Sequence, residues 1–205
     1  GPTIQAAGIR ALNNGTTLDG VLQSLKEWKE SRTIPIVIMS YFNLIFAYGI
    51  ERFAETCVES GVDGLIIPDL PLEEEEMVVP IFTQHEIALI RLAAPTSPRS
   101  RIEQIAKRTE GFLYAVTVKG TTGARTEYDE GLESYLQELQ SHTSAPVLAG
   151  FGVSTPEQVK ELGQYCDGVI VGSKIVELLA AGKRKEIAEL IHASKATSGL
   201  SEVGR

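Results

Sequence analysis

Cysteine and histidine are scarce in this sequence, and a long hydrophobic run is missing. The two cysteines, Cys57 and Cys166, lie far apart and match neither a disulfide framework nor a metal-binding spacing. The three histidines, at residues 85, 142 and 192, are equally scattered, which disfavours a metal site or a histidine-based nucleophile. We therefore expect buried cysteines in a cytoplasmic protein that binds no metal.

Positive charge is also in short supply, because the net charge is −8. Such a balance disfavours nucleic acid or an anionic membrane as the main partner. No apolar stretch approaches the ~20 residues of a membrane-spanning helix. The sequence starts at Gly1-Pro2 instead of Met, so the lack of a signal peptide says little about the natural start. A local anion site is still open, since helix ends can supply one.

Six short apolar runs recur along the 205 residues, with amphipathic segments between them. Most are nearly continuous in apolar residues, which is typical of parallel strands that are buried on both faces. The sequence therefore predicts one α/β domain, residues 1–205, of the (β/α)8 TIM barrel type with six of its eight strands present. The runs are Ile34–Tyr41, Gly64–Leu70, Ile87–Ala94, Phe112–Val118, Val147–Gly152 and Val169–Gly172.

The segments between the runs carry helix signals. One helical stripe holds Leu18, Val21, Leu22, Leu25 and Trp28. We therefore expect Trp28 to pack in the core or between its helix and the barrel. The acidic run at 73–76 is interpreted as a solvated helix start. Ser154 and Glu157 have the spacing of a capping box, which predicts Ser154 as the N-cap of a helix.

Two of the apolar runs end in glycine and a small hydroxyl residue, directly before a helix pattern. They are 146–154, which ends in Gly-Phe-Gly-Val-Ser, and 167–174, which ends in Gly-Ser-Lys. Two such strand ends side by side aim backbone N–H groups and two helix N-termini at one point. This arrangement predicts a phosphate site, and in α/β barrels the loops after the last two strands usually build it.

Polar residues at strand ends are the remaining candidates for function. Tyr41 and Asn43 follow the first run, Asp69 ends the second, and Tyr114 lies within the fourth. Asp69 suits either catalysis or a turn that leads into a helix. The loop at 119–126 brackets two threonines with glycines, so it suits either a closing lid or an ordinary loop.

These motifs, taken together and in order, resemble the tryptophan synthase α subunit over essentially the whole chain. The matching segments are Gly1–Gln5, Ile38–Phe46, Pro68–Pro71, Gly120–Gly123, Gly150–Ser154 and Val171–Ser173. The resemblance implies a lyase of tryptophan biosynthesis that cleaves indole-3-glycerol phosphate to indole and glyceraldehyde 3-phosphate. It also implies a β subunit as partner in an αββα heterotetramer, and no cofactor of the chain's own, because pyridoxal phosphate belongs to the β subunit.

The resemblance assigns a role to each candidate residue. It implies a phosphate site, an indole and glyceryl pocket, a closing lid, and a face toward the β subunit, which moves Asp69 from catalysis to partner contact. In that order, the residues are Gly123, Gly152, Gly172 and Ser173 for phosphate; Tyr41, Tyr114, Phe151 and Ile170 for the pocket; Thr122 for the lid; and Asn43, Asp69 and Pro71 for the partner.

Cleavage needs one proton delivered to the indole ring and another removed from a glyceryl hydroxyl, which two carboxylates can do. In the family these are a Glu at the end of the second strand and an Asp directly before the segment that corresponds to Gly1–Gln5. Neither is among the 205 residues, so we expect a chain that lacks the first two strands and their helix and is inactive alone. An alternative is a non-catalytic fragment that serves as a binding or scaffold module for a β subunit.

Overall fold

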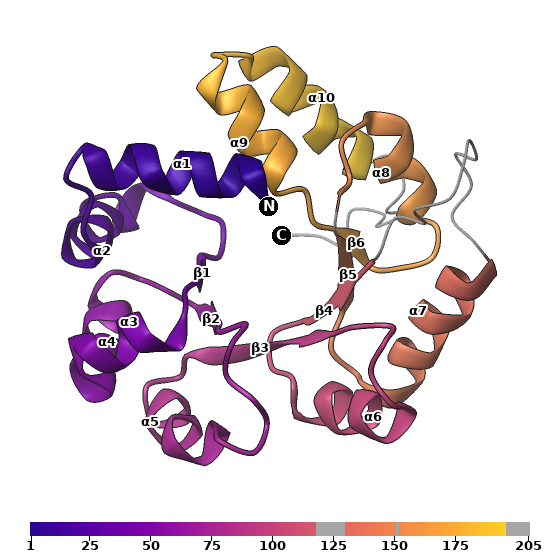
Figure 1. Ribbon diagram of the computed structural model, residues 1–205, viewed down its shortest axis with the longest axis horizontal. Helices are drawn as coiled ribbons and strands as arrows, with labels where there is room; N and C mark the ends of the chain where they lie inside the picture. The colour runs from indigo at the N-terminus through magenta and orange to yellow at the C-terminus, as the bar shows by residue number, and fades with distance from the viewer. Residues whose placement is uncertain (118–129, 151, 196–205) are drawn as a thin grey trace.

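The computed structural model describes residues 1–117, 130–150 and 152–195, and Figure 1 shows their arrangement. Its six strands form one sheet in the order β1-β2-β3-β4-β5-β6, and every neighbouring pair is parallel. Each of the six predicted runs overlaps a strand that is shorter than the run, and the last strand begins one residue before its run and shares only Val169 with it. The strands are β1 Val37–Met39, β2 Gly64–Ile66, β3 Ala88–Ala93, β4 Leu113–Val116, β5 Val147–Gly150 and β6 Gly168–Val169.

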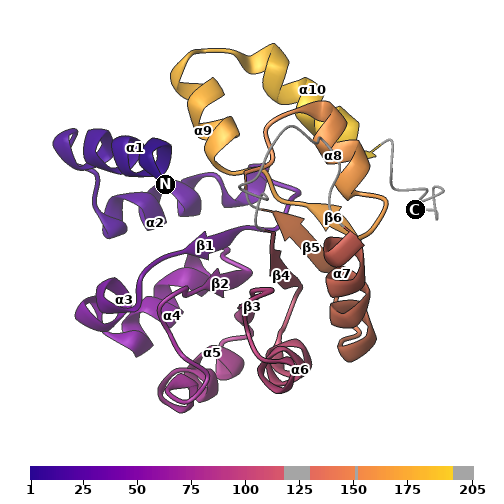
Figure 2. The same cartoon turned by 45° about the vertical axis from the view of Figure 1, so that its right-hand side comes forward.

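Helices connect successive strands and cover the convex side of the curved sheet (Figures 1 and 2). This alternation in sequence order is the α/β barrel arrangement that the sequence predicts, here as an open half-barrel. The helices are α1 Pro2–Asn13, α2 Leu18–Glu27, α3 Phe42–Tyr48, α4 Ile50–Glu59, α5 Val79–Gln84, α6 Arg99–Arg108, α7 Glu130–His142, α8 Pro156–Leu162, α9 Ser173–Ala180 and α10 Arg184–Lys195, with short 3-10 turns η1 Lys29–Ser31 and η2 Glu75–Met77.

Two apolar clusters fill the space between the sheet and these helices. Phe53 of α4 and Phe82 of α5 are buried in the cluster behind the first strands. Leu136 and Leu139 of α7 are buried in the second, behind β4 and β5. Cys57 lies fully buried in the first cluster, where burial raises the pKa of its thiol to about 12. It is therefore a small core residue, as the sequence predicts.

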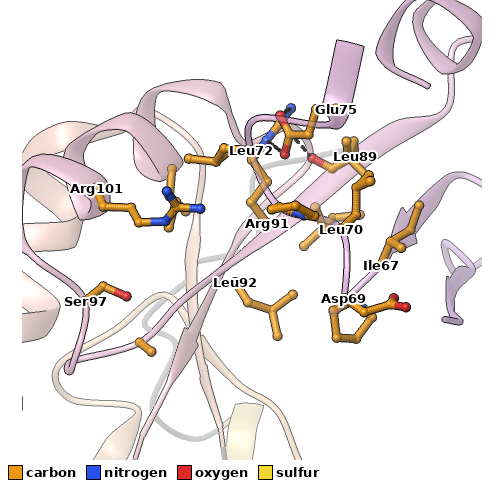
Figure 3. A pocket seen from close by; sticks show the side chains of 15 residues that line it. Ile67, Asp69, Leu70, Leu72, Glu75, Leu89, Arg91, Leu92, Ser97 and Arg101 are labelled. Atoms are coloured by element: carbon orange, nitrogen blue, oxygen red, sulfur yellow. Dashed lines mark hydrogen bonds and ion pairs between the residues drawn. The ribbon is translucent and has the colours of Figure 1, made fainter. Parts of the chain in front are cut away.

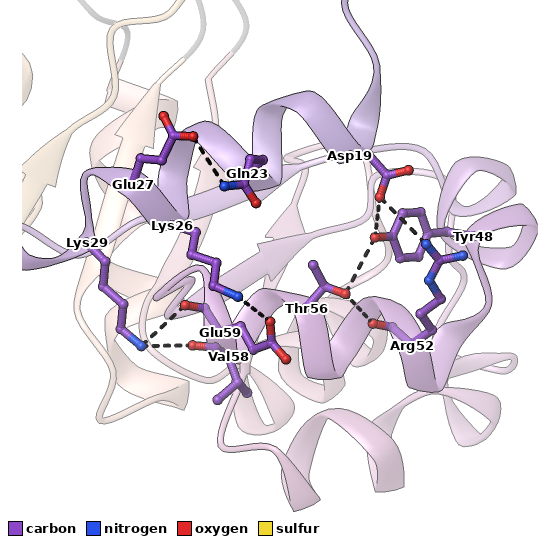
Figure 4. A network of polar contacts seen from close by, with 10 residues as sticks. All are labelled: Asp19, Gln23, Lys26, Glu27, Lys29, Tyr48, Arg52, Thr56, Val58 and Glu59. Atoms are coloured by element: carbon purple, nitrogen blue, oxygen red, sulfur yellow. Dashed lines mark hydrogen bonds and ion pairs between the residues drawn. The ribbon is translucent and has the colours of Figure 1, made fainter.

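Polar contacts join α2 and η1 to α3 and α4 on the outer surface (Figure 4). The Tyr48 hydroxyl donates to Asp19 at 2.6 Å, and Lys26 pairs with Glu59 at 2.7 Å. Lys29 donates to the Val58 carbonyl at 3.1 Å, near the end of α4. These contacts are exposed, so each adds little stability, and their effect is to orient α2 and η1 against α3 and α4.

Three predictions about the helices are wrong in detail. Trp28 is 68 % exposed, because α2 ends at Glu27 and the chain turns at Trp28 into η1. The acidic run is not fully solvated, since Glu75 is 6 % exposed and paired with Arg91 of β3. The N-cap of α8 is Thr155 instead of Ser154, because Pro156 favours the first helical position and so leaves the cap to the residue before it.

Candidate functional site

Most of the candidate residues that the structure describes follow the carboxyl ends of the strands. Because all six strands are parallel, their carboxyl ends lie on the same side of the half-barrel. The carboxyl ends of β4, β5 and β6 are neighbours there, since β5 pairs with β4 on one side and with β6 on the other. In barrels of this kind the carboxyl ends of the strands carry the active site.

The loop after β6 leads into a helix whose start is open. Gly172 is the N-cap of α9, and no side chain among the described residues caps it. No described atom lies within 4 Å of where a Cβ on Gly172 would be. Ser173 begins the helix and is exposed. The first backbone N–H groups of α9 are thus available to an anion, with the helix dipole in its favour.

The loop after β5 does not lead to the second open helix N-terminus that the sequence predicts for the phosphate site. Gly152 is exposed with φ of 73°, a left-handed conformation that favours glycine. The start of α8, however, is closed by its own side chains. Gln158 Oε1 accepts the N–H of Ser154 at 2.8 Å and of Thr155 at 3.2 Å, and Thr155 Oγ1 accepts the N–H of Gln158 at 3.3 Å. Of the two helix N-termini expected at the phosphate site, α9 is the one left uncapped within the described residues.

Lys174, in the first turn of α9, pairs with a side chain of its own helix. Its Nζ lies 2.8 Å from Oε1 of Glu177. The lysine charge that opposes the helix dipole is therefore partly compensated without an anion.

Two of the predicted pocket residues belong to the two strands that flank β5: Tyr114 lies within β4, and Ile170 lies just after β6. Leu113 and Ala115 are buried against the outer helices, so Tyr114 between them faces the concave side. Burial raises the pKa of the Tyr114 phenol. Ile170 lies just after β6, against Gly150 of β5. A Cβ on Gly150 would come within 2.5 Å of the Ile170 carbonyl oxygen, so only glycine fits there.

Tyr41 follows β1, three strands away from β4 in the sheet, and is 63 % exposed. It begins α3 as the N-cap. Tyr114 and Ile170 therefore lie on either side of β5, and Tyr41 lies after β1, at the other end of the strand order. The remaining predicted residues, Phe151 of the pocket, Gly123 of the phosphate site and Thr122 of the lid, lie outside the described residues.

The residues predicted to face a partner lie at the ends of β1 and β2. Asn43 in α3 and Asp69 after β2 are exposed, and Pro71 is half-buried. The Asp69 carboxylate accepts the N–H of Phe42 at 2.9 Å. Asp69 therefore stabilises the start of α3, a role that sequence analysis missed because the two residues are 27 positions apart.

A cavity of about 350 Å³ lies behind this edge, between the end of β2, η2, β3 and α6 (Figure 3). Both arginines in its wall are bound to glutamates. Arg91 contacts Glu75 twice at 2.8 Å, and Arg101 contacts Glu73 at 2.6 Å. The Arg101 guanidinium lowers the pKa of Glu73 from 4.5 to about 2. The cations of the cavity are therefore matched by carboxylates and do not point to an anionic ligand.

The described residues offer no metal site of clustered side chains and no membrane-spanning helix. In that part of the chain, no group of three or more His, Cys, Asp or Glu side chains could hold a metal ion. No helix there is long and apolar enough to cross a membrane.

The parallel half-barrel, its outer helices and its candidate site at the strand ends define an α/β protein of the (β/α)8-barrel class. Within this class, the profile of the family described as tryptophan synthase alpha chain matches residues 1–202. The chain belongs to this family of lyases in tryptophan biosynthesis.

Individual relatives agree with the family match. The tryptophan synthase alpha chain of Bacillus cereus is 53% identical over 195 residues, which are 95% of this chain and 76% of the relative. That of Bacillus mycoides is 52% identical over 197 residues, or 96% of this chain and 76% of the relative.

Solved structures give the same result. A tryptophan synthase subunit alpha from Campylobacter jejuni superposes with a TM-score of 0.86 at 32% identity, over 93% of this chain and 77% of that one. A chain from the tryptophan synthase a2b2 complex of Pyrococcus furiosus superposes with a TM-score of 0.84 at 34% identity, over 94% and 81%.

Proposed function

We propose that this chain forms the indole-3-glycerol phosphate site of a tryptophan synthase α subunit. The observation that carries the proposal is the uncapped start of α9, which lies on the strand end next to the left-handed Gly152. A phosphate there accepts N–H groups that no described side chain binds, and its charge is stabilised by the helix dipole.

The indole end of the substrate then lies over the concave face at β4 to β6. Tyr114 of β4 and Ile170 after β6, on the two strands that flank β5, offer it an apolar wall. The proposal assigns Gly123, Gly152, Gly172 and Ser173 to the phosphate, Tyr41, Tyr114, Phe151 and Ile170 to the indole and glyceryl parts, and Thr122 to a lid.

The reaction of the α subunit is a retro-aldol cleavage. The carbon–carbon bond between the indole ring and the glyceryl chain breaks, a proton goes to the ring carbon, and a proton leaves the glyceryl hydroxyl. An acid and a base are required, and the two carboxylates that the family resemblance implies are not among these 205 residues. We propose that the 205-residue chain alone holds the substrate without cleaving it.

The proposed partner is a β subunit, which receives the indole and holds the pyridoxal phosphate. Exposed Asn43 and Asp69 and half-buried Pro71 lie after the ends of β1 and β2, and they form the proposed contact face. The relative from Pyrococcus furiosus was solved as an a2b2 complex. By this analogy the assembly of the whole subunit is αββα.

Calorimetric titration with inorganic phosphate and with indole-3-glycerol phosphate tests the proposal. Gly172→Asp places a carboxylate where the phosphate is proposed to bind, in space that is open among the described residues. We expect at least a tenfold loss of affinity for both ligands, because like charges repel at close range.

The matched control is Thr17→Asp, which keeps a capping oxygen at the N-terminus of α2, on another part of the molecule. Its affinities should equal those of the wild type. If the wild type binds neither ligand, or if Gly172→Asp binds both unchanged, the proposed site is wrong.

A further inference from the structure

Residues 152–155 are the described part of the connection between β5 and α8. Gly152 is exposed and has the left-handed φ of 73°. Val153 after it is only 4 % exposed, and its side chain is buried in the apolar cluster behind β4 and β5. The connection therefore has one exposed residue at the proposed phosphate site, directly before a residue that is anchored in the core.

One oxygen atom binds the polar hydrogens at the other end of this connection. Gln158 Oε1 accepts the N–H of Ser154 at 2.8 Å and the N–H of Thr155 at 3.2 Å. It also accepts the hydroxyl of Ser154 at 3.1 Å. Backbone N–H groups can only donate, so the amide of Gln158 faces the connection with its oxygen and not with its nitrogen.

The N–H groups of the connection thereby fall into two sets. Those of Ser154 and Thr155 are bound to Gln158 and are not available to a ligand. Those of Gly152 and Val153 have no hydrogen-bond acceptor among the described residues. Successive free N–H groups at a left-handed residue are a backbone arrangement that binds anions.

We propose that Gln158 is a positioning residue for the phosphate. By holding Ser154 and Thr155, it fixes the two preceding N–H groups in the direction in which the phosphate binds. This inference rests on the proposed function, in which Gly152 contacts the phosphate. Gln158 acts through the connection and not through contact with the ligand, because a segment that is already ordered loses little freedom on binding.

A purely structural role for Gln158 would be to cap α8, and the two halves of the capping box separate that role from positioning. Gln158 Oε1 binds the connection, whereas Thr155 Oγ1 accepts the N–H of Gln158 at 3.3 Å, within the first turn of α8. Loss of either oxygen weakens the start of the helix. Loss of the Gln158 oxygen alone releases the N–H groups of the connection.

The test compares Gln158→Met with Thr155→Val. Each replacement is close in size to the native side chain and lacks its capping oxygen. Equilibrium dialysis measures the affinity of the 205-residue chain for indole-3-glycerol phosphate, and urea unfolding measures stability. We expect both variants to lose stability to a similar extent. Gln158→Met should bind at least about fivefold more weakly, because its connection must be ordered on binding, whereas Thr155→Val should keep the wild-type affinity.

Hydrogen exchange of the unliganded chain reports on the connection itself. The amides of Ser154 and Thr155 should exchange at least about tenfold faster in Gln158→Met than in the wild type. In Thr155→Val, the amide of Ser154 should exchange as in the wild type. Addition of inorganic phosphate should shift the amide NMR signals of Gly152 and Val153 in the wild type.

Three outcomes would overturn the inference. If Gln158→Met binds like the wild type while Gly172→Asp binds more weakly, the proposed function stands and Gln158 only caps α8. If Gln158→Met and Thr155→Val lose affinity equally, the stability of the helix matters and positioning does not. If the wild type does not bind the substrate, the proposed function and this inference are both wrong.

Discussion

The buried ion pair between Glu75 and Arg91 gives the sharpest stability prediction. The two side chains are 8 % and 7 % exposed, and they form two contacts of 2.8 Å. Arg91 also donates to the carbonyls of Leu89 and Arg108. Removing either partner leaves a buried charge without its counter-ion, which costs about 3–5 kcal/mol.

The variants are Arg91→Leu, Glu75→Leu and the double replacement. For a chain of this length, the stability lost by each single variant corresponds to a fall in melting temperature of roughly 6–20 °C, at about 2–4 °C per kcal/mol. The double variant has no unpaired buried charge. We expect it to be more stable than either single variant, because a buried ion pair is often no better than an apolar pair of similar volume.

Urea unfolding followed by circular dichroism measures the free energy of unfolding of each variant. Together with the wild type, the three variants form a double-mutant cycle that gives the coupling free energy between the two side chains. A control is Lys107→Leu, which removes an exposed pair with Glu103 at 2.6 Å. It should change stability by less than ~1 kcal/mol. The reasoning would be refuted if the single variants lost no more stability than this control, or if the double variant were less stable than both single variants.

Two further predictions concern stability. Glu73, whose pKa Arg101 lowers to about 2, stabilises the fold at pH above 4.5, and this contribution is lost as pH falls from 4.5 toward 2. The melting temperature of Glu73→Gln should therefore change less over this pH range than that of the wild type; equal pH profiles would contradict the pairing. Gly61 has φ of 67°, and an added Cβ would lie 2.5 Å from Arg32 Nη2, whereas Gly15, with φ of 77°, has open space among the described residues. Gly61→Ala should thus cost more in urea unfolding than Gly15→Ala, which bears only the backbone cost of about 1 kcal/mol; equal costs would mean that the Arg32 contact is unimportant.

The strands could be predicted because their signal is local. A run such as Ile87–Ala94 is apolar over most of its length, and the structure confirms a buried strand there. The exposed Trp28 was predicted wrongly, because periodicity does not show where a helix ends. The cap of α8 was predicted one residue early, since Ser154 and Thr155 both have a suitable partner three residues on.

Contacts between residues that are distant in the sequence were harder to predict than the strands. The acidic run at 73–76 has the composition of a solvated surface, and nothing local singles out Glu75. A signal was nevertheless present, because an arginine at position 91 inside a buried strand requires a carboxylate nearby. At the site, glycine positions indicated an anion-binding edge. The Gln158 side chain caps the start of α8, whereas the start of α9 has no side-chain cap among the described residues. The direction of the Gln158 side chain is known only from the structure.

The central claim is that this chain holds indole-3-glycerol phosphate and does not cleave it. The most direct test incubates the purified 205-residue chain with the substrate, then measures bound substrate by equilibrium dialysis and released indole by chromatography. The account predicts binding that inorganic phosphate competes away and no indole above the uncatalysed background. Release of indole by the chain alone, or no binding of the substrate, would contradict it.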